Sequence, residues 1–199
     1  KIWAAMFERS KRVQGGWVVD GEFLEVNVGG LSTSQLPIGG GFVIGTVYGL
    51  APRSHGELVF QQDEERRILP GLRGVRSLAA IDLNNDGAEE LLVGDGWHYA
   101  YGEQAIARLL LIEGPEFTES RVIAVLDGEY SVREVAEVGG RLLVTGTQSV
   151  HLLSRDVLGW SDSVVAPISE NGNSVVVHTD VGVGALISGD PARIVGLRD

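Results

Sequence analysis

The sequence contains no cysteine and little positive charge. The absence of cysteine excludes disulfide bonds, thiolate metal sites, iron–sulfur ligation and catalysis by a thiol. Lysine and arginine number 16 against 27 aspartates and glutamates, so the net charge is −11. A protein that follows the phosphates of nucleic acid, or that docks on an anionic membrane, needs a basic face. The charge balance therefore argues against both nucleic acid and an anionic lipid surface as partners.

Proline is also scarce, with six residues, whereas glycine is abundant, with 28 of 199. No Gly-X-Y period accompanies the glycines, so they indicate many tight turns rather than collagen. Hydrophobic residues make up 44% of the chain, which is enough to form a buried core. We therefore expect residues 1–199 to form a single folded domain.

One stretch, Val26–Pro52, carries no formal charge and is long enough to span a bilayer as a helix. It contains Ser32-Thr33-Ser34-Gln35, Pro37 and the three glycines Gly39–Gly41, which suit a lipid-exposed helix poorly. We therefore predict an exposed loop that leads into one buried strand, and no membrane insertion.

Short apolar runs bounded by glycine recur along the whole chain, and most of them have the length of a strand. Two segments, Glu103–Ile112 and Ser131–Val138, carry apolar residues at helical spacing, so short helices are an alternative there. The clearest runs are Gly41–Tyr48, Glu57–Phe60, Val75–Leu83, Glu90–Val93, Arg108–Ile112, Arg121–Leu126, Arg141–Val144, Val150–Leu153, Ser163–Ala166, Ser174–His178 and Gly184–Ile187.

A longer repeat underlies these strands. A hydrophobic run followed by glycine and then threonine or aspartate occurs four times, at intervals of 43 to 52 residues. A period in the forties with about four strands is typical of a β-propeller blade. An immunoglobulin-like sandwich has evenly spaced strands without this longer period. We therefore predict an all-β propeller, in which the repeated glycines are Gly45, Gly94, Gly146 and Gly189.

The length of the chain bounds the number of blades. Four periods fit, and Lys1–Val28 supplies strands of a neighbouring blade, which predicts about four to five four-stranded blades. These blades form either a compact ring closed by strands from both termini or a fragment of a larger propeller. Because the sequence starts with Lys1 rather than methionine, the fragment is the favoured alternative.

The segment Asp82–Glu90 reads D-L-N-N-D-G-A-E-E and has the oxygen spacing of a calcium loop. Oxygen-bearing side chains fall at positions 1, 3, 5 and 9, and glycine falls at position 6. In a calcium loop alternate residues point inward and the glycine permits a sharp turn. An EF-hand is excluded because position 12 is Val93 and the flanks are strands. The alternative interpretation is a solvated acidic hairpin loop.

Together with its flanking strands, Val75–Gly94 resembles an FG-GAP or VCBS-type repeat. In that family a strand ends in a D-x-D-x-D-G-x-x-D loop and the next strand ends in V-G. The resemblance implies a propeller blade, such as those of the seven-bladed integrin α-subunit head, whose loop binds a structural Ca2+. The match covers one blade, and Asn and Glu replace the commoner Asp at two positions. The ligands that it implies are Asp82, Asn84, Asp86, the carbonyl of Ala88, and Glu90.

The segment Gly94–Tyr99, G-D-G-W-H-Y, follows directly on the calcium-loop strand. Its aromatic rings, imidazole and carboxylate could stack on a sugar or act as a metal ligand or base. The alternative is structural, with the aromatic residues packed between blades. The candidate ligand-contacting residues are Asp95, Trp97, His98 and Tyr99.

These observations favour a non-enzymatic, calcium-stabilised recognition module that binds a protein or a glycan, in an extracellular or periplasmic location. The sequence has no G-x-S-x-G elbow, no H-E-x-x-H and no phosphate-binding glycine loop. The alternative is a carbohydrate-active lyase or dehydratase that uses His98 or Tyr99 near a metal. Among the other histidines, His55 lies in a loop, while His151 and His178 lie in apolar strands and are expected at core or blade contacts.

Overall fold

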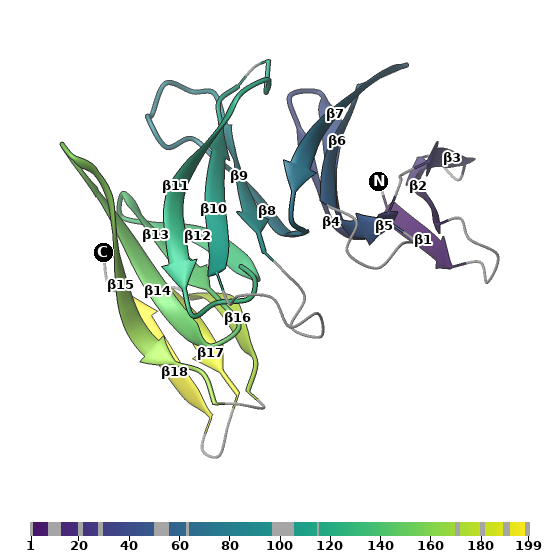
Figure 1. Cartoon of the computed structure of the whole chain (residues 1–199). Helices are drawn as coiled ribbons and strands as arrows, with labels where there is room; N and C mark the ends of the chain where they lie inside the picture. Colours follow the sequence, from purple (N-terminus) through teal and green to yellow (C-terminus); the bar gives the residue numbers. More distant parts are fainter. Residues whose placement is uncertain are drawn as a thin grey trace. The chain divides into compact units, whose positions relative to one another are not determined.

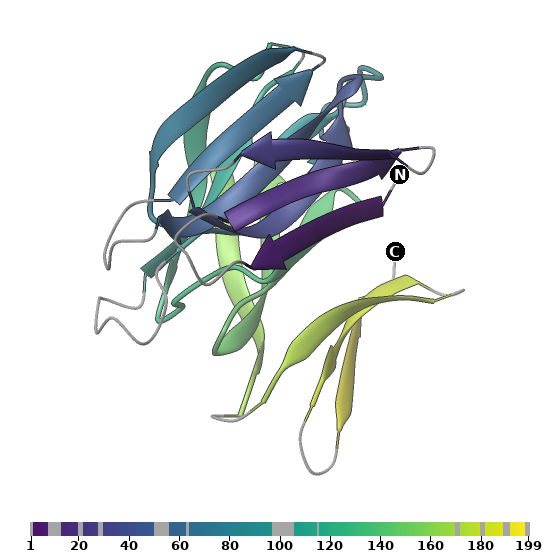
Figure 2. The same ribbon diagram turned by 90° about the vertical axis from the view of Figure 1, so that its right-hand side faces the viewer.

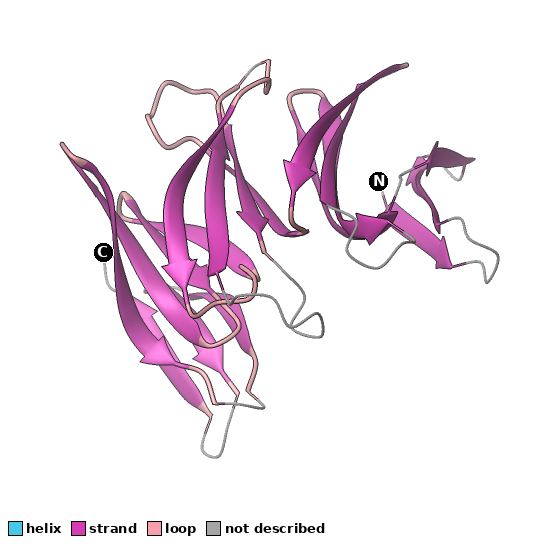
Figure 3. Ribbon diagram, viewed as in Figure 1, coloured by secondary structure: helices cyan, strands magenta, loops and turns pink. Residues whose placement is uncertain are grey.

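The computed structural model describes residues 2–7, 13–19, 22–27, 30–49, 56–62, 64–96, 106–114, 116–169, 172–179, 182–188 and 192–197. Every regular element within these residues is a strand, drawn in magenta in Figure 3. The prediction of an all-β chain is therefore confirmed. Among the described residues, no helix has the length and apolar character that crossing a membrane requires.

The strands form antiparallel meanders, and within each sheet a strand pairs with the next one along the chain (Figure 1). The chain divides into two compact units, Lys1–Val75 and Arg76–Asp199. The first unit holds a three-stranded sheet, whose purple strands lie side by side in Figure 2, and a four-stranded sheet. Its strands are β1 (Ile2–Phe7), β2 (Val13–Val19), β3 (Glu22–Asn27), β4 (Gly30–Ile38), β5 (Gly41–Gly49), β6 (Gly56–Gln62) and β7 (Glu65–Leu72).

The second unit holds two four-stranded sheets and one three-stranded sheet. The first sheet comprises β8 (Val75–Ile81), β9 (Glu90–Asp95), β10 (Ile106–Ile112) and β11 (Ser120–Asp127). The second comprises β12 (Glu134–Val138), β13 (Arg141–Thr145), β14 (Ser149–Asp156) and β15 (Gly159–Pro167). The third comprises β16 (Ser174–Thr179), β17 (Gly182–Ile187) and β18 (Arg193–Leu197).

The prediction of a loop over Ser32–Gln35 is wrong, because these residues belong to β4. This strand lies at the edge of its sheet and pairs with β5 through a turn at Gly39 and Gly40, which both have positive φ. An edge strand accommodates a proline, since its outer N–H groups need no partner in the sheet. The buried strand expected after the loop is confirmed as β5, in which Val43–Val47 are buried.

The two segments for which short helices were an alternative both contain strands. Glu103–Ile112 contains β10, with residues 103–105 outside the described part of the chain, and Ser131–Val138 ends in β12. Pairing decides the conformation, because β10 pairs with β9 on one side and with β11 on the other. A neighbouring strand on each side outweighs a weak helical periodicity over so few residues.

The glycine repeat coincides with the sheets. Gly45 lies in β5, Gly94 lies in β9 and Gly146 directly follows β13, so each marks the second strand of a four-stranded sheet. Gly189 follows β17 in sequence but lies outside the described residues. At Gly94 a Cβ atom would lie 2.1 Å from Oγ of Ser77 and 2.6 Å from Cβ of Val132, so only glycine fits.

Within the second unit, the sheet β12–β15 is buried on both faces. On one face Leu142, Val144 and Leu153 pack with residues of the sheet β8–β11, including Leu92 and Leu109. On the other face Leu143 and Val150 pack with Ala185 and Ile187 of the sheet β16–β18. The side chains alternate along β13, so neighbouring residues enter opposite clusters. The three sheets therefore stack in chain order, face to face.

Candidate functional site

The predicted calcium loop connects β8 to β9 and folds back on itself. Asn85 and Gly87 have positive φ values of 59° and 89°, which allow the reversal. The carboxylate of Asp82 accepts hydrogen bonds from the backbone N–H groups of Asp86 (3.1 Å) and Gly87 (2.9 Å). The carboxylate of Asp86 accepts the N–H of Ala88 at 2.8 Å. Both carboxylates are thus turned toward the backbone of the loop.

Glu90, at the start of β9, closes the loop from the other side. It is 6% exposed, and its Oε2 accepts the N–H of Leu83 at 2.8 Å. The amide nitrogen of Asn84 donates to Oδ2 of Asp86 (2.9 Å) and to Oε1 of Glu90 (3.1 Å). Hydrogen bonds therefore link the side chains of Asn84, Asp86 and Glu90, whereas the Asp82 carboxylate binds backbone N–H groups of the same loop.

The possible metal ligands of this loop suit a hard cation, because they are three carboxylates and one amide oxygen. In the described residues, however, no group of three or more His, Cys, Asp or Glu side chains is spaced to hold a metal ion. The geometry explains this result, since the amide nitrogen of Asn84 bridges Asp86 and Glu90. A cation that bound the carboxylates of both Asp86 and Glu90 would have to displace the Asn84 amide nitrogen from between them. Calcium binding stays a prediction.

Of the candidate ligand-contacting residues, the structure describes Asp95, while Trp97, His98 and Tyr99 lie outside the described residues. The Asp95 side chain is fully buried in β9 and forms an ion pair with the guanidinium group of Arg108 on the neighbouring strand. Nε of Arg108 lies 2.8 Å from Oδ2 of Asp95. Asp95 thus anchors the strand end from which the aromatic segment departs.

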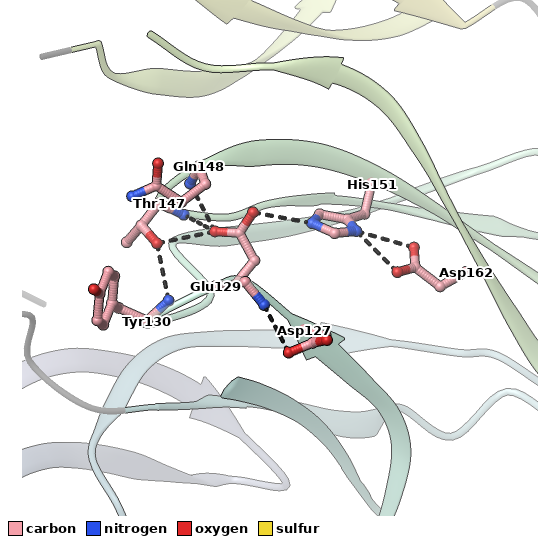
Figure 4. A network of polar contacts seen from close by, with 8 residues as sticks. Asp127, Glu129, Tyr130, Thr147, Gln148, His151 and Asp162 are labelled. Atoms are coloured by element: carbon pink, nitrogen blue, oxygen red, sulfur yellow. Dashed lines mark hydrogen bonds and ion pairs between the residues drawn. The ribbon is translucent and has the colours of Figure 1, made fainter. Parts of the chain in front are cut away.

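A second cluster, which the sequence does not predict, surrounds His151 on β14 (Figure 4). Its Nε2 lies 3.1 Å from Oε1 of Glu129, and its Nδ1 lies 2.9 Å from Oδ2 of Asp162 on β15. His151 and Glu129 have side chains only 2% and 1% exposed, whereas Asp162 is 29% exposed. We call these three residues the Glu129–His151–Asp162 network.

Glu129 comes from the connection between β11 and β12, and its carboxylate enters the turn between β13 and β14. Oε2 accepts the backbone N–H of Thr147, the N–H of Gln148 at 2.7 Å and the hydroxyl of Thr147 at 2.9 Å. A Cβ at Gly146 would lie 2.3 Å from this carboxylate, so glycine makes the space that Glu129 fills. Figure 4 shows the carboxylate between the turn and the imidazole.

The chain was compared with known proteins. No protein-family model matches it, and no match was found among curated proteins. The resemblance of Val75–Gly94 to calcium-loop repeats therefore stays a prediction from the sequence.

The contacts of the network favour the charged forms of both Glu129 and His151. Burial raises the pKa of Glu129, but the hydrogen bonds from His151, the Gln148 backbone and Thr147 outweigh it and lower this pKa below 4.5. Burial lowers the pKa of His151, but the hydrogen bond and charge of Glu129, with those of Asp162, outweigh it and raise this pKa above 6.5. The network therefore favours an imidazolium between two carboxylates.

These two shifts set the pH range in which the network stabilises the fold. Because the His151 pKa is raised, its contribution is fully present below the unfolded value and is lost as pH rises through the folded value. Because the Glu129 pKa is lowered, its contribution is present above the unfolded value and is lost as pH falls through the folded value. Both contributions are therefore fully present between the unfolded pKa values of Glu129 and His151, 4.5 and 6.5, and they decrease beyond this range.

Proposed function

We propose that this chain is a calcium-stabilised β-propeller module that recognises a protein or a glycan. The observation that carries the proposal is the fold of a loop between two strands, in which the Asn84 side chain contacts those of Asp86 and Glu90 and the Asp82 carboxylate binds the loop backbone. The three proposed carboxylate ligands, Asp82, Asp86 and Glu90, repel one another, and a divalent cation cancels that repulsion. The proposed role of the ion is structural.

The stacking of the sheets in the second unit supports the propeller architecture. Successive meanders share apolar clusters, and the sheet β12–β15 contributes to a different cluster on each face. This is how the blades of a propeller contact their neighbours. The glycine of the second strand recurs in three sheets, which supports the interpretation of one sequence period as one blade.

We expect calcium to raise the melting temperature of the protein, and the Asp86→Ala variant to lose that rise. An ion that binds only the native state stabilises it by mass action, and the variant lacks one ligand. Thermal melting of chelated protein during a calcium titration measures the rise, and calorimetry measures the heat of binding.

Glu89→Ala is the matched control for the calcium experiment. Glu89 lies in the same loop and is exposed, so its removal changes the loop charge as Asp86→Ala does but removes no proposed ligand. The control should keep most of the calcium-dependent rise. If wild-type protein shows neither heat nor a thermal shift, or if both variants lose the shift equally, the loop is no calcium site.

The proposed ligand contact is the aromatic segment that follows β9. Trp97, His98 and Tyr99 come directly after Gly96, and the strand end before them is anchored by the ion pair of Asp95 with Arg108. An aromatic ring beside polar groups suits the stacking and hydrogen bonding of a sugar or a protein side chain. The pairing of Asp95 also argues against its use as a free catalytic carboxylate.

We expect His98→Ala to reduce the signal of a bound glycan or protein partner while leaving the melting temperature nearly unchanged. Residues held for ligand contact often contribute little to packing. A glycan array and a metabolite screen, read beside melting curves, test this expectation, with His178→Ala as the control because His178 is exposed on β16. If the wild-type protein turns over a substrate and a stably folded His98→Ala protein does not, the chain is an enzyme and not a recognition module.

A further inference from the structure

The Glu129–His151–Asp162 network holds together two sheets that the chain connects only through Gly128–Arg133. Tyr130 in this connection donates its N–H to the Thr147 hydroxyl at 3.0 Å, and Arg133 donates its N–H to the Thr145 carbonyl at 2.8 Å. The Glu129 carboxylate adds its bonds to Thr147 and Gln148. These polar contacts therefore fasten the connection that follows β11 to the β13–β14 turn, beside the apolar cluster that the two sheets share.

The contacts of His151 favour a ring that carries a proton on both nitrogens. Oε2 of Glu129 accepts three hydrogen bonds, which favour the ionised carboxylate, and an ionised Glu129 accepts from Nε2. On the other side of the ring, Nδ1 lies within 3.0 Å of both carboxylate oxygens of Asp162. A neutral imidazole has one donor and one lone pair. After loss of a proton, a lone pair would face a carboxylate.

We propose that this network is a proton-dependent latch: Glu129 clamps the Gly128–Arg133 connection onto the β13–β14 turn while His151 carries both ring protons, and the clamp weakens when His151 loses one. Asp162 is partly exposed, so water reaches the network at the Nδ1 side and takes up the proton there. The buried Glu129 then has a neutral neighbour, which stabilises its charge less.

In the part of the chain that the structure describes, no charged group other than Glu129 and Asp162 bonds to the His151 ring. On β13 the residue opposite His151 is the apolar Val144. Three charged residues lie at strand ends: Arg141 at the start of β13, and Arg155 and Asp156 at the exposed end of β14. The others bond elsewhere: Arg121 pairs with Glu113, Asp127 accepts the Gly128 N–H, Arg133 donates to Asn173, and Glu134 accepts the Val176 N–H. The protonation of His151 therefore responds mainly to Glu129 and Asp162.

Two measurements on the full chain test the latch. Histidine resonances in an NMR pH titration report the protonation of His151, assigned with the His151→Gln variant and compared with the exposed His178 in the same spectra. Hydrogen exchange at the amides of Thr147 and Gln148, corrected for intrinsic exchange, reports the clamp. Between pH 6.5 and the His151 midpoint, we expect protection of these amides to fall about tenfold per pH unit.

Two variants that each remove one charge separate the two sides of the ring. Asp162→Asn should lower the His151 midpoint and shift the loss of protection to lower pH, while the clamp still closes in acid. Glu129→Gln should also lower the midpoint but reduce the protection of Thr147 and Gln148 at every pH. Glu119→Gln, an exposed glutamate in the same unit, should change neither quantity.

Several results would overturn the latch. One is a His151 resonance that does not titrate above pH 6.5, because the ring would then be neutral between its two carboxylates. Another is wild-type protection at Thr147 and Gln148 that follows the same pH profile as in His151→Gln. The pH dependence of wild-type hydrogen exchange needs no variant, so protection of Thr147 and Gln148 that stays constant above pH 6.5 overturns the latch even if His151→Gln misfolds.

Discussion

Replacing Glu129 with alanine should lower the free energy of unfolding at neutral pH by about 3–5 kcal/mol, the cost of removing one partner of a buried ion pair. The side chain is 1% exposed, and its loss leaves the His151 imidazolium with Asp162 alone. It also leaves the backbone N–H groups of Thr147 and Gln148 without their carboxylate acceptor. Chemical denaturation monitored by circular dichroism measures the change.

Glu119→Ala is the control for this prediction, because Glu119 is exposed in the same unit. Substitutions at such surface positions usually change stability by about 0.5 kcal/mol or less. Equal stabilities for the Glu129→Ala and Glu119→Ala proteins would mean that the buried carboxylate contributes nothing beyond its charge. The network would then have no structural role.

Leu92→Ala should destabilise the second unit by about 2–5 kcal/mol, the usual cost of a large-to-small substitution in a packed core. Leu92 lies on β9 and is fully buried in the cluster that joins the sheet β8–β11 to the sheet β12–β15. Truncation removes apolar contacts and leaves a cavity between two sheets that cannot fully close around it. The same denaturation experiment measures the loss.

Leu158→Ala is the control for Leu92→Ala, because it makes the same substitution at an exposed position. Leu158 lies in the turn between β14 and β15 and is 93% exposed. Its truncation should change the unfolding free energy by about 0.5 kcal/mol or less. A loss for Leu158→Ala that equals the loss for Leu92→Ala would contradict the assignment of the core to the interface between these sheets.

The strands that could be predicted from the sequence are those whose signal is local. In β13, Leu142, Leu143 and Val144 form a short apolar run that ends two residues before Gly146. The repeat of this pattern predicted the second strand of each four-stranded sheet. In contrast, β4 was predicted to be a loop, because Ser32 and Gln35 resemble loop residues until the pairing with β5 is known. The charged edge strand β7 was not expected for the same reason.

The candidate sites also differ in whether their signal is local in the sequence. The calcium-loop side chains lie within nine residues, so their spacing alone predicts that they share one loop, in which Asn84 contacts both Asp86 and Glu90. Glu129, His151 and Asp162 come from a connection and two strands, and their sequence separations follow no motif. His151 was expected at a core or blade contact, and it is buried. Its partners depend on strand pairing and sheet stacking, which the spacing of residues does not encode.

The burial of the sheet β12–β15 on both faces also affects how the second unit opens. In a linear array, each element is stabilised by its own internal contacts and by its nearest neighbours. Unfolding the middle sheet would strip an apolar face from each neighbour, whereas detaching β16–β18 breaks only the cluster around Ala185 and Ile187. Local unfolding of this unit should therefore begin at its C-terminal sheet, while the middle sheet exchanges its amide protons last.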